Sequence, residues 1–64
     1  MTPLGLVEDL ELERHAVAEL EQRAGELWAA GGTYARRAAL ELRREAGDAR
    51  AHVLELERRL AASS

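Results

Sequence analysis

The chain contains no cysteine, no phenylalanine, no isoleucine and no lysine. The absence of cysteine excludes disulfide bonds and thiolate zinc sites. A chain of 64 residues buries only about 60% of the surface that its unfolded form exposes. Small folds of this size are usually stabilised by disulfides, by a metal or by association. We therefore expect this chain to be stabilised by oligomerisation.

Long apolar runs are also missing, because no stretch of 18 or more apolar residues occurs. The sequence therefore predicts no membrane-spanning helix. The opening segment MTPLGLVEDLELE has neither the basic region nor the uninterrupted apolar region of a signal peptide. We expect a soluble, cytoplasmic protein with no membrane partner. No set of nucleophile, base and orienting acid is recognisable, so we expect no enzymatic activity.

Helix-forming residues, chiefly leucine, alanine, glutamate and arginine, dominate the composition. They follow two heptad stripes with apolar residues at positions a and d. In the first half the stripe comprises Leu6, Leu10, Val17, Leu20, Ala24 and Leu27. In the second half it comprises Ala35, Ala39, Leu42, Ala46, Ala49, Val53, Leu56 and Leu60. The pattern predicts an all-α, coiled-coil-like fold, interrupted only by Glu13 at a d position.

Two adjacent glycines, Gly31 and Gly32, separate the stripes and predict a hinge between two helices. We expect one domain over residues 1–64, as an antiparallel hairpin. Its first helix is predicted over about 4–30, its turn over 31–33 and its second helix over about 34–62.

Several residues near the predicted helix ends suit particular cap positions. Thr2 and Pro3 fit a cap and a first helical position, and Thr33 fits the N-cap of the second helix. Gly47 followed by Asp48 indicates either a kink or a break that begins a short third helix.

Folding the chain back at residue 33 places a larger residue opposite an alanine in four successive layers, as close packing requires. The same register predicts contacts between the flanking side chains. They are the ion pairs Arg23–Glu45, Asp9–Arg59 and Glu21–Arg43, and a cation–π contact between Trp28 and Arg36. Arg14 opposite Arg50 is the one mismatch, with Glu13 between them.

Large apolar residues outside the a and d stripes would remain exposed on an isolated hairpin. They are Val7, Leu12, Trp28, Leu40 and Leu54. Two hairpins packed as a homodimeric four-helix bundle would bury them. We therefore expect four of them, Leu12, Trp28, Leu40 and Leu54, to bind a partner, either a second copy or another protein. The leading interpretation is a non-enzymatic protein–protein interaction module that acts as an adaptor, a regulator or an assembly subunit.

Nucleic-acid binding is the alternative function. Residues 1–32 are predominantly acidic, whereas residues 33–64 carry seven arginines. Arg37 and Arg44 fall at f positions, pointing away from the hairpin seam, and could contact phosphates. The overall plan resembles that of the Rop family of plasmid copy-number regulators, RNA-binding hairpins that dimerise into four-helix bundles. The resemblance covers the whole chain as an architecture and rests on no residue motif.

Two carboxylate–histidine pairs have i, i+4 spacing, namely Glu11–His15 and Asp48–His52. Because they point outward in different directions, we interpret them as exposed helix pairs and expect neither metal nor cofactor. For Glu13 two structural interpretations remain open. The carboxylate could be a buried charge that sets the register, or its stem could lean outward to solvent.

Overall fold

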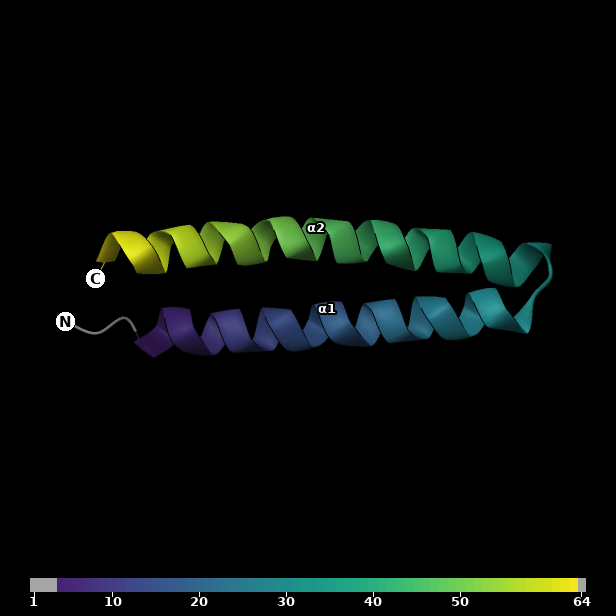
Figure 1. The fold of residues 1–64 in the computed structure, drawn as a ribbon, viewed down its shortest axis with the longest axis horizontal. Coiled ribbons are helices and arrows are strands. Elements are labelled where there is room, and N and C mark those ends of the chain that lie inside the picture. The colour runs from purple at the N-terminus through teal and green to yellow at the C-terminus, as the bar shows by residue number, and fades with distance from the viewer. Residues whose placement is uncertain (1–3, 64) are drawn as a thin grey trace.

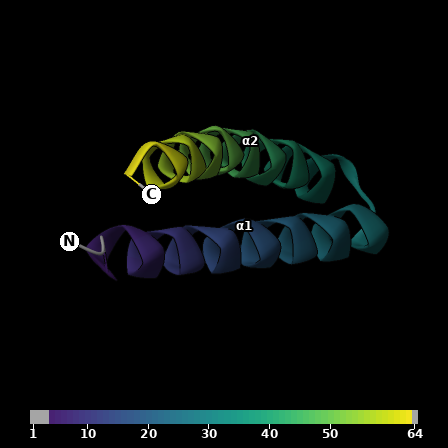
Figure 2. The same ribbon diagram turned by 60° about the vertical axis from the view of Figure 1, so that its left-hand side comes forward.

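The computed structural model describes residues 4–63 as two helices, α1 (Leu4–Ala30) and α2 (Thr33–Ser63), joined by a two-residue turn. The helices lie side by side and run in opposite directions (Figure 1). Figure 2 shows the same two-layer arrangement from a second direction. The predicted antiparallel helical hairpin is thereby confirmed. The cap predicted at Thr2 and Pro3 lies outside the described residues.

The seam between the helices is built from the predicted stripes, and the a positions are its most buried part. The buried side chains are Leu10, Val17, Ala24, Ala39, Ala46, Val53 and Leu56. Leu56 alone among them occupies a d position, and the other apolar d residues with described side chains are half-buried. Alanines in three of these places allow the two backbones to approach closely.

The turn depends on two glycines with left-handed backbone angles, φ 79° at Gly31 and 87° at Gly32. The Gly31 N–H donates to the Trp28 carbonyl (3.3 Å), and the Arg36 N–H donates to the Gly32 carbonyl (3.1 Å). Gly32, rather than Thr33, therefore accepts the first helical hydrogen bond of α2 and occupies the N-cap position. A left-handed angle has little steric cost only for glycine, which explains the Gly-Gly pair.

Helix α2 continues through Gly47 without a break. The neighbouring Ala46 and the later Val53 are both buried against α1, so tertiary packing offsets the low helix propensity of the glycine. Apart from its chain neighbours and the backbone of its own helical turns, a Cβ atom at Gly47 would meet no atom within 4 Å. The glycine is therefore not required by any contact inside the hairpin.

The hairpin is elongated, with extents of 51 × 14 × 11 Å and a radius of gyration of 14.7 Å. A compact chain of this length would have a radius of about 11 Å. Its accessible surface is 5016 Å², whereas folded monomers of its 7.1 kDa mass expose about 4100 Å². In the described part of the chain, neither helix combines the length and apolar character needed to cross a membrane.

Candidate interaction surface

One side of the hairpin seam, here called the Trp28 flank, carries the e and b positions of both heptad patterns. These positions lie about 100° around each helix from the a and d stripe. On α1 the flank comprises Val7, Glu11, Arg14, Ala18, Glu21, Gly25 and Trp28. On α2 it comprises Arg36, Leu40, Arg43, Gly47, Arg50, Leu54 and Glu57. The flank carries four arginines and three glutamates, so its net charge is close to zero.

The other side of the seam, here called the acidic flank, carries the g and c positions. Its seven carboxylates are Asp9, Glu19, Glu26, Glu41, Glu45, Asp48 and Glu55. Only Arg23 and Arg59 oppose them among its permanently charged residues. Most of the negative charge of the chain is therefore on one side of the molecule.

Ion pairs connect the two helices along the Trp28 flank. The Arg14 guanidinium lies 3.3 Å from the Glu57 carboxylate, and Arg50 forms an ion pair with Glu21. These partners differ from the predicted ones, because Glu21 contacts Arg50 instead of Arg43. Side chains lean toward the N-terminus of their own helix. In an antiparallel pair, Glu21 and Arg50 lean toward each other, whereas Glu21 and Arg43 lean apart.

The predicted cation–π contact between Trp28 and Arg36 is confirmed, and a second arginine joins it. The Arg36 Cζ lies 5.2 Å from the centroid of the Trp28 ring, and the Arg43 Cζ lies 5.0 Å from it. The indole therefore holds two guanidinium groups of α2 beside the turn. Each exposed contact of this kind is worth about 0.5–1 kcal/mol.

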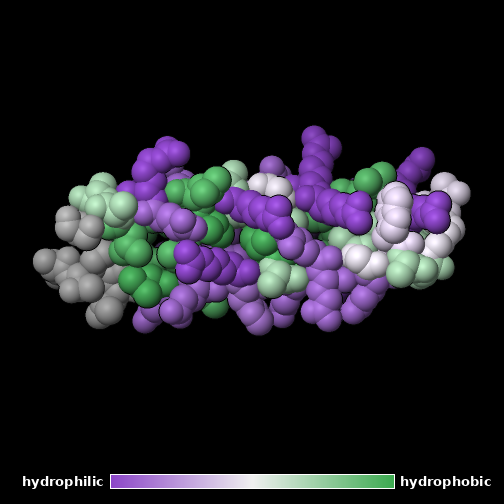
Figure 3. Space-filling model, in the orientation of Figure 1, coloured by the Kyte–Doolittle hydropathy of each residue, from purple (hydrophilic) through white to green (hydrophobic). Residues whose placement is uncertain are grey.

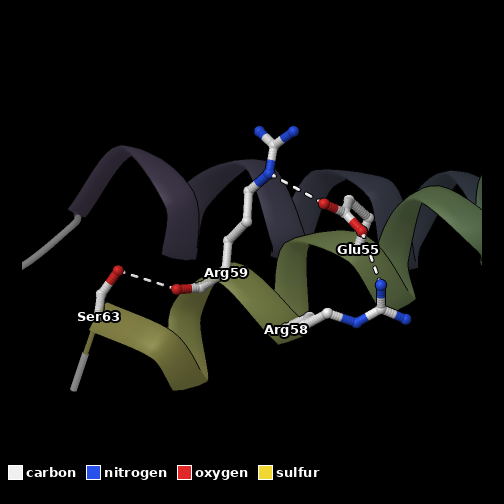
Figure 4. A network of polar contacts seen from close by, with 4 residues as sticks. All are labelled: Glu55, Arg58, Arg59 and Ser63. Carbon is white, nitrogen blue, oxygen red and sulfur yellow. Dashed lines mark hydrogen bonds and ion pairs between the residues drawn. The ribbon is translucent and has the colours of Figure 1, made fainter.

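In the part of the chain that the structure describes, neither of the two ion pairs predicted on the acidic flank forms, and one of the four residues, Arg59, bonds within its own helix instead. Among residues 4–63, Arg23 and Glu45 form no ion pair, and Arg59 bonds to Glu55 on its own helix rather than to Asp9. Figure 4 shows Glu55 accepting from both Arg58 and Arg59, while the Ser63 hydroxyl donates to the Arg59 carbonyl at 2.8 Å. One-turn spacing brings these groups together without any contribution from α1.

The four apolar residues predicted to bind a partner are exposed, but the hairpin divides them between its sides. Leu40 is 55% exposed, Leu54 is 61% exposed and Trp28 is 39% exposed. All three belong to the Trp28 flank. Leu12, which is 69% exposed, occupies a c position beside Glu19 on the acidic flank. Figure 3 shows apolar groups in green between charged groups in purple along the hairpin.

A shallow groove of about 420 Å³ lies on the Trp28 flank beside Gly47. Glu21 of α1 and Arg43, Ala46 and Arg50 of α2 complete its lining. Because Gly47 has no side chain, the surface is recessed at this position. The exposed side chains of Leu40 and Leu54 protrude one heptad away on either side. The heptad pattern predicts the two exposed leucines but not the groove, although Gly47 at a b position is the sequence signal for it.

Arg37 and Arg44, the residues predicted for nucleic-acid binding, are exposed on the outer surface of α2. Within the described part of the chain neither has a carboxylate partner. Glu41 lies between them in sequence but belongs to the acidic flank. Their guanidinium groups are therefore accessible to phosphate, although two cations form only a small basic surface.

Glu13 is half-buried at the seam and lies 3.4 Å from the His52 Nδ1. Among the residues described, neither Arg14 nor Arg50 forms an ion pair with it, and both arginines form the cross-helix pairs described above. His15 pairs with Glu19 at 3.1 Å, one turn ahead, rather than with Glu11. Over residues 4–63 no three potential metal ligands come together.

Comparisons with models of protein families, with curated proteins and with solved structures found no match to this chain.

Proposed function

We propose that this chain is a small non-enzymatic protein–protein interaction module that works as a homodimeric four-helix bundle. Its role would be that of an adaptor, a regulator or an assembly subunit. The chain has no cysteine, so its fold needs no oxidising compartment, and we include a cytoplasmic location in the proposal.

The observation that carries the proposal is the large exposed surface of the single hairpin. Its 5016 Å² exceeds the roughly 4100 Å² expected of a folded monomer of this mass by about 900 Å². A standard protein–protein interface buries about 800 Å² per partner. Exposed leucines and a tryptophan contribute to this surplus, and such residues are enriched where proteins associate.

Sedimentation equilibrium over a range of concentrations tests the proposal. A mass twice the 7.1 kDa of the chain, with dissociation on dilution accompanied by loss of helicity, is the expected result. A hairpin that remains monomeric and folded at the highest concentration would contradict the bundle. Association that continues beyond the dimer would contradict its closed symmetry.

Nucleic-acid binding is the second candidate, and the unpaired guanidinium groups of Arg37 and Arg44 in the described chain are the observation in its favour. Titration of labelled RNA and DNA of mixed sequence at several salt concentrations separates the two candidates. Phosphate contacts make the affinity fall steeply with salt. Binding that is absent at low salt would exclude this candidate.

A further inference from the structure

We infer that the second copy docks on the Trp28 flank, with α2 against α2 in antiparallel orientation and Gly47 at the two-fold axis. The inference rests on the proposed dimer and adds which surface closes it and in what register. Three observations support it: the charges of the two flanks, the spacing of the exposed leucines, and the matching positions of small residues along the two helices.

Charge selects the flank. A two-fold contact brings the same surface of each copy together. On the acidic flank this contact would place seven carboxylates and two arginines against an identical set, and like charges in a desolvated interface are strongly unfavourable. The Trp28 flank has four arginines and three glutamates, most of which already have a partner within the hairpin. Only this flank can approach its own copy without a large electrostatic cost.

The spacing of Leu40 and Leu54 selects the register. Each leucine lies seven residues from Gly47, so both point in nearly the same direction from α2. In an antiparallel pair centred on Gly47, Leu40 meets Leu54 of the second copy, and Leu54 meets Leu40. The two glycines face each other at the centre, where the groove leaves room for close approach of the backbones.

The facing row on α1 is consistent with the same axis. Ala18 lies at the same level of the hairpin as Gly47 and occupies the corresponding b position. Around Ala18 the row is again symmetric, because Glu11 and Gly25 lie seven residues to either side. Each Glu11 therefore faces a glycine of the second copy instead of another carboxylate. The centres of the two rows lie at the same level, as one common two-fold axis requires, and the small residue at each centre allows close approach.

In this register each e residue lies opposite an e residue of the second copy, and three of the four kinds of pair are favourable in charge or in apolar character. On α1, Val7 faces Trp28 of the second copy, and Arg14 faces its Glu21. On α2, Arg36 faces Glu57 of the second copy. Arg43 and Arg50 form the one like-charged combination, and the Glu21–Arg50 ion pair and the Trp28 ring already balance it within each hairpin.

Charge-introducing substitutions on the two flanks test the surface. Leu40→Glu and Leu54→Glu place a strong helix former at exposed positions. Each should raise the dimer dissociation constant by about 100-fold, since each leucine enters two symmetry-related contacts and each lost contact costs about tenfold. Leu12→Glu, at a similarly exposed leucine on the acidic flank, should leave the constant within about threefold of the wild type. Equal loss in all three variants, or loss in Leu12→Glu alone, would overturn the assignment.

Cross-linking tests the register independently of any effect on folding. Because the chain has no other cysteine, Gly47→Cys should form a covalent dimer under mild oxidation, and Gln22→Cys, on the outer surface of α1, should not. An equimolar mixture of Leu40→Cys and Leu54→Cys should cross-link as the mixed pair, whereas each variant alone should remain largely monomeric on a denaturing gel. Cross-linking of Leu40→Cys with itself would indicate parallel helices and overturn the register. A wild-type dimer with none of these cross-links would overturn this inference and leave the proposed function standing, whereas a monomeric wild type would contradict both.

Discussion

Glu21 of α1 forms an ion pair with Arg50 of α2, not with Arg43, which instead stacks on Trp28. The choice follows from the direction in which helical side chains lean. Because each leans toward its own N-terminus, a residue of α1 meets the α2 residue nearer the open end of the hairpin. The same lean explains why Arg14 forms its ion pair with Glu57, which is nearer the open end than Arg50. The apparent clash of Arg14 with Arg50 therefore does not arise.

The Glu21–Arg50 pair gives a first prediction. Both side chains are substantially exposed, so Glu21→Arg or Arg50→Glu alone should destabilise the protein by about 0.5–1 kcal/mol. The combined exchange should recover most of this loss because the pair is restored in reverse. Urea denaturation followed by circular dichroism measures each step. Glu21→Arg combined with Arg43→Glu is the matched control and should show no recovery.

The turn gives a second prediction. Gly31 and Gly32 both have positive φ, so replacing either with valine should reduce the free energy of unfolding by about 1–2 kcal/mol. Gly5→Ala, at an exposed helical position with open space around its Cβ, should cause no loss. Thermal and urea melts of the three variants test the difference. Valine variants as stable as the wild type would favour one continuous helix over the hairpin.

The double contact of Trp28 gives a third prediction. A double-mutant cycle of Trp28→Leu with Arg43→Gln should show a coupling of about 0.5–1 kcal/mol, and a cycle with Arg36→Gln should give a similar value. Arg44→Gln, one residue along but on the outer surface of α2, serves as the control and should show no coupling. Denaturation curves recorded by circular dichroism provide the values. Coupling confined to Arg36 would mean that Arg43 does not stack on the indole.

A fourth prediction concerns Arg37 and Arg44. Changing both to glutamine should leave the free energy of unfolding nearly unchanged, because neither makes an ion pair within the described chain. If the protein binds nucleic acid through them, the double change should weaken binding and reduce the salt slope by about 2, close to one per lost phosphate contact. Fluorescence anisotropy at several salt concentrations gives the slope.

The control for this fourth prediction is Arg23→Gln combined with Arg59→Gln on the acidic flank, which removes the same net charge elsewhere. An equal effect of the two double variants would show that overall charge, rather than this arginine pair, governs binding. If the protein is solely an interaction module, partner binding should survive the Arg37 and Arg44 changes. It should then be weakened by Trp28→Ala or Leu40→Ala.

The hairpin itself could be predicted from the sequence, because heptad spacing determines which residues share a helix face and two adjacent glycines permit the left-handed turn. Those signals are local and independent of how the helices meet. The continuity of α2 at Gly47 was not predictable, since helix propensity favours interruption there. Burial of Ala46 and Val53 against α1 outweighs that preference.

Tertiary structure alone decided which charged side chains form pairs across the seam. Heptad spacing already assigns Leu12, at a c position, to a different side of an antiparallel hairpin from Leu40 and Leu54, at b positions, whereas the packing of the helices determines which groups make contact. This packing brings Arg50 to Glu21 and His52 to Glu13, so that each carboxylate has a partner on the opposite helix. Residue spacing along one helix specifies the direction in which each side chain points only relative to the axis of that helix. The partners across the seam depend on how the second helix is rotated and on the opposite lean of its side chains.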